Sequence, residues 1–439
     1  MRLKETVRFF RFDDLVYVRD TDTATDYLYN EIVYDILQFL SRSPGCTVEQ
    51  LLRTLSEHYA VEDPDAFRAD ITAFLEELGR ERLLLEDKNA AEELPILDLS
   101  GQIQQLCADR HRLFQACLEL TYRCNERCVH CYLDEQSFGK ELELDTYRAI
   151  LDELADMGCP SLLLTGGEVS LHPNFPEIAE YASGKGFLVN IYTNGLALPD
   201  SALQRLIALH PNSISFSFYG SGPEVHDLVT GVPGSFERSL RTMLMCKCAG
   251  VDTFIKTVAL KQNAADLEAL FQLGQRLNIP VSLAKLVLPS VHGTKNSAAY
   301  KLERAEDFSA LFRLEEKYQH TAPHKREQRG GDRFFCSAGV CTLSIDPYGE
   351  VYPCSSLRTS LGNVKQHALR ELWDRSAEKL DEILPREKLA AQCETCAYAA
   401  YCSVCPAALL REAGGLQCSA DICTIARGAY QFASQTEHV

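Results

Sequence analysis

Strand-like and helical segments alternate through the middle of this 439-residue chain. Six short runs rich in β-branched and aromatic residues have the composition of buried strands. They lie at residues 116–121, 161–165, 187–193, 213–220, 252–260 and 280–288. Five helical segments separate them, at about residues 145–157, 174–184, 200–209, 234–249 and 264–277. Six strand–helix units predict an α/β fold with parallel strands and right-handed crossovers, a partial (β/α)6 TIM-type barrel. Functional side chains should then gather at the carboxyl ends of the strands.

Three cysteines follow the first of these strands. The stretch LTYRCNERCVHCYL places Cys124, Cys128 and Cys131 at the spacing C-x3-C-x2-C in a polar turn. A structural zinc site needs four ligands, and the turn has no obvious fourth. His130 lies inside the motif, but neighbours in a tight loop seldom point at the same ion. A 4Fe-4S cluster held by three thiolates instead leaves one iron open to a small molecule.

The ends of the next four strands predict the chemistry of that molecule. The two glycines after the second strand permit a close backbone approach, and the glutamate that follows them can meet an ammonium group. Polar groups after the third strand suit a ribose. The candidate binding residues are Gly166, Gly167, Glu168, Thr193, Asn194, Ser217 and Lys256. An amino acid joined to a nucleoside fits this set, and S-adenosylmethionine (SAM) is such a molecule.

The cysteine motif, the aromatic Tyr132 after it and the Gly-Gly-Glu stretch together resemble the radical SAM superfamily. The resemblance implies that the amino and carboxylate groups of SAM chelate the open iron, and it adds Tyr132 to the cofactor-binding residues. It also implies that an electron from the cluster cleaves SAM to methionine and a 5′-deoxyadenosyl radical, which abstracts hydrogen from a substrate. The cofactor then supplies the difficult chemistry, and the barrel excludes water.

A second group of cysteines begins after residue 330. FCSAGVCTLSIDPYGEVYPC is followed by CETCAYAAYCSVC and two later cysteines, with a hairpin turn predicted at DPYGE. Paired C-x2-C motifs alone are typical of a zinc ribbon. The full order of spacings resembles the SPASM domain, which implies two auxiliary 4Fe-4S clusters and three clusters in all. By position, Cys336, Cys341, Cys354 and Cys405 would hold the first auxiliary cluster. Likewise, Cys393, Cys396, Cys402 and Cys423 would hold the second, with Cys418 as an alternative to Cys423.

Six cysteines remain outside these motifs: Cys46, Cys107, Cys117, Cys159, Cys246 and Cys248. We expect them to be small buried hydrophobic residues.

Residues 1–90 predict a small winged-helix-like domain of strands and three helices, with Thr47 as a helix N-cap and a last short strand at 83–85. DNA binding is disfavoured, because acidic residues outnumber basic ones 19 to 11 in residues 1–88. The layout YNEIVYDIL…FLEELGRERLL resembles the RiPP recognition element, which binds leader peptides of ribosomally made natural products. We expect a polar linker at 91–112, the barrel at 113–325 and the SPASM domain at 326–439.

Charge and hydropathy restrict the binding partners and the cellular compartment that we expect for the protein. A net charge of −18 argues against nucleic acid as a partner. The first residues lack a signal-peptide pattern, and no run of about 18 apolar residues is long enough to span a membrane. We therefore expect a cytoplasmic protein without a membrane partner. In that reducing compartment, 18 cysteines favour metal or redox chemistry over disulfides.

The expected function is a radical SAM oxidoreductase that modifies a ribosomal precursor peptide, leader plus core. A cross-link is the favoured product and a thioether the favoured link; C–C or C–O cross-linking, peptide splicing and sulfatase-maturase-type oxidation are alternatives. A non-catalytic metal-binding peptide adaptor is an alternative of another class. A reducing donor such as flavodoxin or ferredoxin would supply electrons. His226 and Asp227 suggest an acid and a base, but structural hydrogen bonds explain them equally well, so no catalytic residue is named.

Overall fold

The computed structural model describes residues 1–85, 99–133, 140–291, 296–321, 323, 336–383, 396–413 and 418–436. By its internal packing the chain divides into two compact units, one built mainly from Met1–Arg110 and the other from most of the remaining residues. Of the candidate residues named above, only Cys393 lies outside the described residues.

The N-terminal unit is an antiparallel three-stranded sheet with three helices, as predicted. The sheet has the order β1-β2-β3. Its elements are β1 (Val7–Phe12), β2 (Leu15–Asp20), β3 (Thr25–Asn30), α1 (Ile32–Arg42), α2 (Val48–His58) and α3 (Pro64–Arg80). The expected last strand is a single bridge between Leu3 and Leu84. The helices bury apolar stripes against the sheet, and Val16, Leu37 and Leu78 are fully enclosed.

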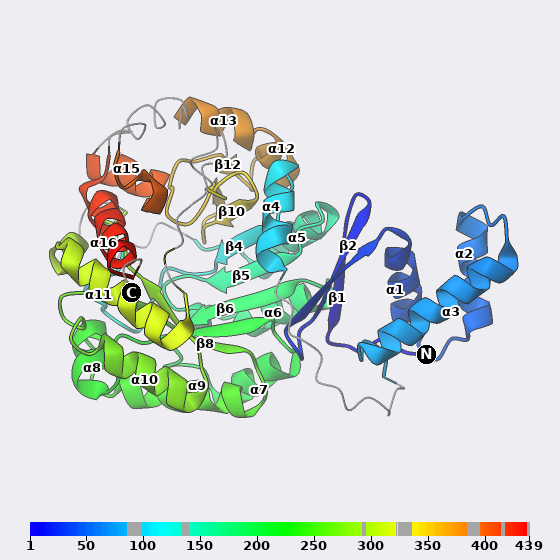
Figure 1. The fold of residues 1–439 in the computed structure, drawn as a ribbon, viewed down its shortest axis with the longest axis horizontal. Helices are drawn as coiled ribbons and strands as arrows, with labels where there is room; N and C mark the ends of the chain where they lie inside the picture. The colour runs from blue at the N-terminus through cyan, green and yellow to red at the C-terminus, as the bar shows by residue number, and fades with distance from the viewer. Residues whose placement is uncertain are drawn as a thin grey trace. The chain divides into compact units, whose positions relative to one another are not determined.

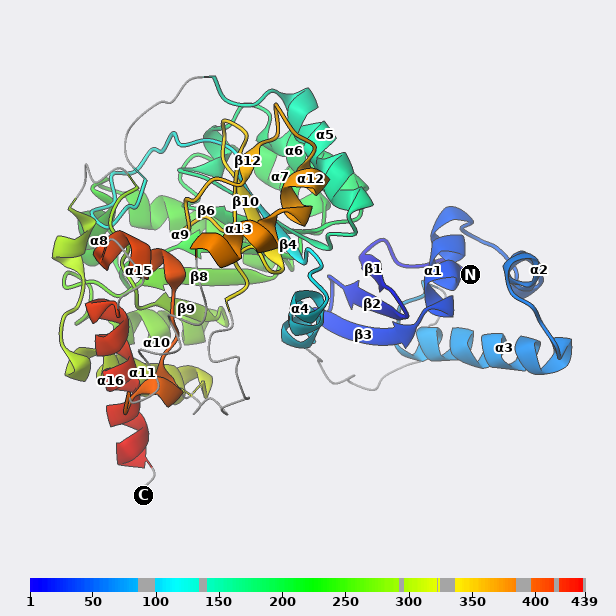
Figure 2. The same ribbon diagram turned by 90° about the horizontal axis from the view of Figure 1, so that it is seen from above.

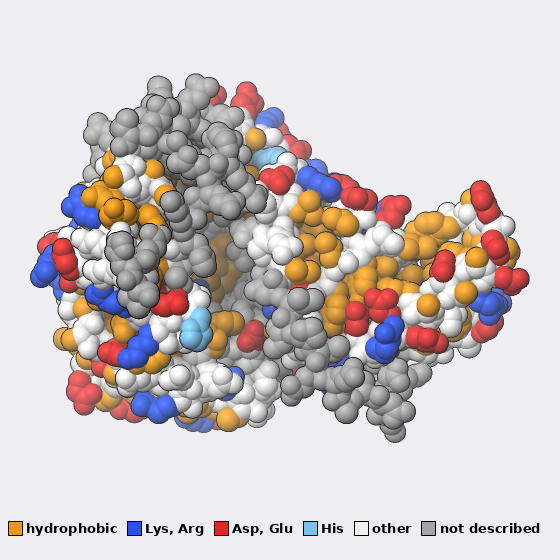
Figure 3. Space-filling view, viewed as in Figure 1, with side chains coloured by type: hydrophobic (Ala, Val, Ile, Leu, Met, Phe, Trp, Pro, Cys, Tyr) orange, Lys and Arg blue, Asp and Glu red, His pale blue; other side chains and the backbone are white. Residues whose placement is uncertain are grey.

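Two helix starts in this unit show how the sequence sets the fold. Thr47 and Gln50 form a reciprocal capping box at α2, which confirms the predicted N-cap. Asp63 accepts hydrogen bonds from the first amides of α3, and Pro64 occupies the first turn. On the face drawn in Figure 3, basic side chains of this unit stand apart among acidic ones, which agrees with the argument against nucleic acid.

The segment expected to be a polar linker contains a helix, α4 (Ser100–Asp109). Ile103 and Cys107 are almost completely buried. The backbone amide of Leu99, directly before α4, donates to the Asp26 carboxylate at 2.8 Å. Two well-buried positions four residues apart explain why this polar-looking stretch is helical.

The six predicted barrel strands are all present and parallel, in the order β4-β5-β6-β7-β8-β9 (Figure 1). They are β4 (Gln115–Glu119), β5 (Ser161–Thr165), β6 (Leu188–Thr193), β7 (Ser213–Ser217), β8 (Thr253–Val258) and β9 (Val281–Ala284). Four of them end earlier than the sequence predicts. The apolar residues just beyond, such as Leu120 and Phe218, are buried in the loops that form the site.

Helices connect successive strands as right-handed crossovers require (Figures 1 and 2). They are α5 (Leu144–Asp156), α6 (Phe175–Gly184), α7 (Asp200–Ala208), α9 (Ser235–Cys248) and α10 (Leu267–Leu277). A short helix, α8 (Pro223–Thr230), and a 3₁₀ turn, η1 (Val169–Leu171), were not predicted. Both are too short for a clear apolar period.

The sheet continues beyond the barrel strands into the C-terminal region. Strand β10 (Thr342–Ile345) pairs in parallel with β4, and β11 (Glu350–Tyr352) and β12 (Gly362–Asn363) follow antiparallel. The predicted hairpin joins β10 to β11, and Gly349 supplies its positive φ of 93°. One nine-stranded sheet therefore carries both cysteine regions.

The remaining helices cover the C-terminal part. They are η2 (Ser297–Tyr300), α11 (Ala305–Gln319), α12 (Leu369–Asp374), α13 (Ser376–Ile383), η3 (Ala399–Tyr401), α15 (Pro406–Ala413) and α16 (Ala420–Thr436). Helix α16 packs closely on α11 at Gly428, where a Cβ would stand 2.6 Å from that of Phe308. No helix of the described residues has the length and apolar character needed to cross a membrane.

The Thr47 cap gives a direct test of the N-terminal unit. We expect Thr47→Ala to lower the free energy of unfolding by about 1 kcal/mol, because an amide of α2 loses its acceptor. Thr54→Ala in the same helix is the control, since that hydroxyl only donates to the carbonyl of Gln50. Equal losses in both variants, measured by denaturant unfolding, would contradict the assignment.

Candidate functional site

The loop with Cys124, Cys128 and Cys131 begins five residues after β4 ends and is held against α8. The amide of Arg127 donates to the carbonyl of Thr230 at 2.8 Å. The amide of Val129 donates to the carbonyl of Val229 at 3.1 Å. Val129 and Cys128 also pack against a small apolar cluster around Val229. The loop is thus shaped by main-chain bonds before any ligand binds.

The Gly-Gly-Glu stretch after β5 lies directly against the start of this loop. Gly167 donates its amide to the carbonyl of Thr121 at 2.7 Å, and Glu168 donates to that of Arg123 at 2.9 Å. A Cβ on Gly166, whose φ is 149°, would lie 2.3 Å from the Thr121 carbonyl oxygen. A Cβ on Gly167 would lie 2.6 Å from the carbonyl oxygen of Arg123. Only glycine permits this contact, so the two motifs form one structure.

Glu168 ties the second and third strand ends together. Its buried carboxylate accepts from the Thr193 hydroxyl at 2.7 Å and from the Asn194 amide at 2.7 Å. The Asn194 side chain donates in turn to Asn125 of the cysteine loop at 2.7 Å. The predicted residues at three strand ends are therefore in one hydrogen-bonded group. Glu168 orders that group, so its predicted contact with an ammonium ion must use lone pairs that these donors leave free.

The chemistry of the donor set fits an iron–sulfur cluster. Burial raises the pKa of Cys124 to about 12 and that of Cys128 well above its ordinary range. A thiolate there needs a cation to compensate its charge, and a metal centre supplies one. The amide of Glu126 donates to the Cys124 sulfur at 3.4 Å, a contact that also suits a ligating sulfur. In the described part of the chain, however, no three His, Cys, Asp or Glu side chains converge at metal-binding distance.

The surroundings of His130 are those of a packed ring and not of a metal ligand. Its ring packs edge-on against Tyr219, with centroids 4.6 Å apart. Burial lowers its pKa to about 4, so the ring is neutral at pH 7. His130 therefore acts as a packing partner of Tyr219 in the apolar part of the loop.

Ser217, at the end of β7, is paired in register with Lys256 within β8. The Lys256 ammonium stands 4.4 Å from the ring centroid of Tyr192 on β6. Among the described residues, neither side chain hydrogen-bonds to the Glu168 group. Their assignment to a cofactor stays a prediction.

Sequence reasoning missed a buried charged group below the cysteine loop. Glu119, the last residue of β4, is fully buried and forms an ion pair with Arg358 at 2.7 Å. The hydroxyls of Tyr122 and Tyr132 donate to the same carboxylate, at 3.0 and 2.9 Å. A glutamate inside an otherwise apolar strand was the available signal, because buried carboxylates require partners.

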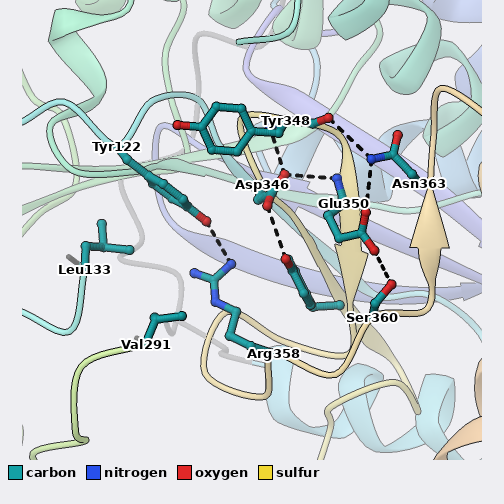
Figure 4. Close-up of a pocket in the computed structure, with 10 residues that line it drawn as sticks. Tyr122, Leu133, Val291, Asp346, Tyr348, Glu350, Arg358, Ser360 and Asn363 are labelled. Carbon is teal, nitrogen blue, oxygen red and sulfur yellow. Dashed lines mark hydrogen bonds between the residues drawn. The ribbon is translucent and has the colours of Figure 1, made fainter. Parts of the chain in front are cut away.

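A cavity of about 550 Å³ opens beside this group (Figure 4). Tyr122 and Leu133 line it from the cysteine loop, and Asp346 and Arg358 line it from the C-terminal region. Asp346 accepts from the Tyr352 hydroxyl at 3.2 Å and from two amides of the hairpin. The cavity therefore has polar walls contributed by both cysteine regions.

The C-terminal cysteines have neighbours that bear on their assignment. Cys354 and Cys405 pack in one apolar cluster with Leu357, and Cys405 also packs with Cys402 in another. Cys423 lies near Cys418 and Cys396, and burial is the main cause that raises its pKa. The structure thus brings Cys423 near both Cys396 and its alternative, Cys418. Of the six cysteines expected to be buried, Cys248 is exposed, which corrects that prediction; the other five are buried.

His226 and Asp227 have structural partners. His226 accepts from the amide of Tyr219 at 3.2 Å, and burial lowers its pKa to about 4. Asp227 accepts from the amides of Gly234 and Phe236 and from the Ser235 hydroxyl, so it holds the start of α9. These contacts account for both residues without an acid–base role.

Three family models match separate parts of the chain. Residues 118–274 match the model of the radical SAM superfamily. Residues 336–405 match SPASM, an iron–sulfur cluster-binding domain, and residues 20–84 match coenzyme PQQ synthesis protein D, PqqD. The chain therefore contains a radical SAM domain, with a PqqD domain before it and a SPASM domain after it.

Individual relatives differ in the activities that their names give. The AdoMet-dependent heme synthase of Methanosarcina barkeri is 29% identical over 66% of this chain and 90% of its own. The antilisterial bacteriocin subtilosin biosynthesis protein AlbA of Bacillus subtilis is 25% identical over 89% of this chain and 88% of its own. The Streptococcus suis SuiB structure bound to precursor peptide SuiA has a TM-score of 0.55 at 14% identity, covering 85% of this chain and 88% of that one. The SuiB likeness concerns the fold alone.

The close contact at Gly166 predicts that adding one methyl group, as in Gly166→Ala, destabilises the protein. We expect Gly166→Ala to lower the stability of the barrel unit by about 2 kcal/mol or more, since the positive φ and the Thr121 carbonyl both oppose a Cβ. Iron bound after anaerobic reconstitution should fall as well. Gly184→Ala is the control, because a Cβ there meets nothing within 4 Å. A Gly166→Ala protein that matches the control in both stability and iron content would contradict the packing argument.

Proposed function

We propose that this radical SAM enzyme oxidatively modifies a ribosomally synthesised precursor peptide, installing a cross-link with a thioether as the favoured product. When bound, the cluster and SAM supply a 5′-deoxyadenosyl radical that removes a hydrogen atom from the peptide. The observation that carries the proposal is the packing of Gly166 and Gly167 against the loop that contains Cys124, Cys128 and Cys131.

The residues of this chain bind and orient the cofactor in the proposal. Cys124, Cys128 and Cys131 would hold the cluster, and the close contact of Gly166 and Gly167 with Thr121 and Arg123 fixes the start of their loop. Glu168 keeps Thr193 and Asn194 in place, so that their remaining polar atoms meet the amino-acid and ribose groups. Tyr132, Ser217 and Lys256 complete the predicted set. Fixed hydrogen-bonding groups of this kind reduce the reorganisation needed when the ligand binds.

In the proposal, the C-terminal cysteines hold two auxiliary iron–sulfur clusters. Cys336, Cys341, Cys354 and Cys405 are proposed for one, and Cys393, Cys396, Cys402 and Cys423 for the other, with Cys418 as an alternative to Cys423. Cys405 packs with Cys354 in one apolar cluster and with Cys402 in another. Such clusters would accept the electron that must leave the substrate after hydrogen removal, and this makes bond formation possible. Flavodoxin or ferredoxin is the proposed reductant of the SAM cluster.

A peptide is favoured over a porphyrin because of the N-terminal unit. The described part of its sheet pairs β1 and β3 only with β2, so both outer strands present a backbone edge suited to an extended peptide. On β3, Tyr27 and Tyr29 pack into the core, whereas Leu28 is 42% exposed. The match to AlbA covers 89% of the chain, which exceeds the share after residue 110 and therefore includes part of this unit. The heme synthase match, at 66%, does not require it.

The test is reductive SAM cleavage with and without a precursor peptide. The anaerobically reconstituted protein, given dithionite and SAM, should release 5′-deoxyadenosine. The peptide encoded by a short reading frame beside the gene should lose about 2 Da for each cross-link, because two hydrogens leave. A Cys124→Ala/Cys128→Ala/Cys131→Ala variant should do neither. Cleavage with no change in peptide mass, together with conversion of an iron porphyrin, would instead support the heme-synthase class. Absence of SAM cleavage would favour a non-catalytic adaptor.

A further inference from the structure

The carboxylate of Glu119 is a meeting point for side chains from both cysteine regions. Arg358 donates to Glu119 Oε1 at 2.8 Å, and its other Nη nitrogen is 2.7 Å from Oε2. The Glu119 side chain is fully buried and that of Arg358 is 10% exposed. A buried pair of this kind holds together only while both partners remain, because removing one leaves an uncompensated charge.

The two tyrosines on the same carboxylate bracket the cysteine motif. Tyr122 lies two residues before Cys124, and Tyr132 follows Cys131 directly. Both hydroxyls donate to Glu119, one to each oxygen. The two ends of the cysteine loop are therefore fastened to a single group at the end of β4.

Arg358, from a distant part of the sequence, also binds the Glu119 carboxylate. It lies four residues after Cys354, a proposed ligand of the first auxiliary cluster. Besides its bonds to Glu119, it donates to the Tyr122 hydroxyl at 2.9 Å and stands over the Tyr352 ring at 4.9 Å (Figure 4). A second arginine nearby, Arg411, donates instead to the carbonyl of Pro289 at 3.0 Å. The direct counter-charge of Glu119 thus comes from the C-terminal region.

We propose that Arg358 is a positioning residue for the SAM-cluster loop: through Glu119 it fixes Tyr122 and Tyr132, and so sets the geometry in which Cys124, Cys128 and Cys131 are presented. The C-terminal cysteine region thereby has a mechanical role in SAM binding in addition to holding auxiliary clusters. The inference about SAM rests on the proposed function, whereas the ordering of the loop does not.

The test measures hydrogen exchange of residues 120–133 in the full-length, iron-free protein, followed by SAM kinetics after reconstitution. The variants are Arg358→Met, Glu119→Gln and the two combined. We expect loop amides to exchange about tenfold faster or more in each single variant, with β6 to β8 unchanged, and less loss when both charges are removed. The KM for SAM should rise about tenfold, more than kcat falls, because orientation of the bound cofactor is what suffers.

Two milder variants and one control keep the test decisive if the charge variants fold poorly. Tyr122→Phe and Tyr132→Phe each remove one hydroxyl from Glu119 and keep the ring, and each should loosen the loop in the same direction. Glu315→Gln removes one partner of the Lys285 pair, which is similarly enclosed at 15% and 14% exposure. This control should leave exchange of residues 120–133 unchanged.

Three outcomes separate the claims. Loop exchange that is unchanged in Arg358→Met and in both tyrosine variants would overturn the positioning role. Uniformly faster exchange throughout the barrel would also overturn it, because Arg358 would then only stabilise the fold. Selective loosening of the loop in a protein that cleaves no SAM would support the positioning role while refuting the proposed function.

Discussion

The close contact between the Gly166–Gly167 backbone and the residues that lead into the cysteine loop is the constraint on which the site depends. Main-chain bonds from Gly167 and Glu168 to Thr121 and Arg123 extend the pairing of β5 with β4 past the ends of both strands. Side chains at either glycine would separate the two segments. Since Glu168 then joins Thr193 and Asn194, one contact between two backbones orders three strand ends.

Much of the fold could be predicted from local sequence because the barrel repeats one pattern. Each unit is a short apolar strand followed by a longer amphipathic helix. Both patterns can be recognised in the local sequence without knowing which segments pack against them. The Thr47 cap and the turn at Gly349 were equally local. Helix α4 and the short α8 were missed because their apolar positions are too few to set a period. The pairing of β10 with β4 joins segments more than 200 residues apart, and no local signal specifies it.

The candidate site divides in the same way. The cysteine motif and the Gly-Gly-Glu motif are each a short unbroken stretch of sequence, so the chemistry of each could be predicted from the sequence. Arg358 is an unremarkable residue in a loop, and its role depends on the three-dimensional approach to Glu119. The glutamate within β4 was a visible irregularity, yet its partners could not be known. Likewise, His226 and Asp227 resemble an acid and a base in sequence, whereas their contacts show what each one holds.

Iron, sulfide and zinc per chain after anaerobic reconstitution test the central claim most directly, with the triple alanine variant of Cys124, Cys128 and Cys131 measured in parallel. Three four-iron clusters predict about 12 iron atoms per chain, falling to about 8 in the variant. Two to three zinc ions with little iron would contradict the account, because the cysteines would then staple a peptide-binding protein that lacks radical chemistry.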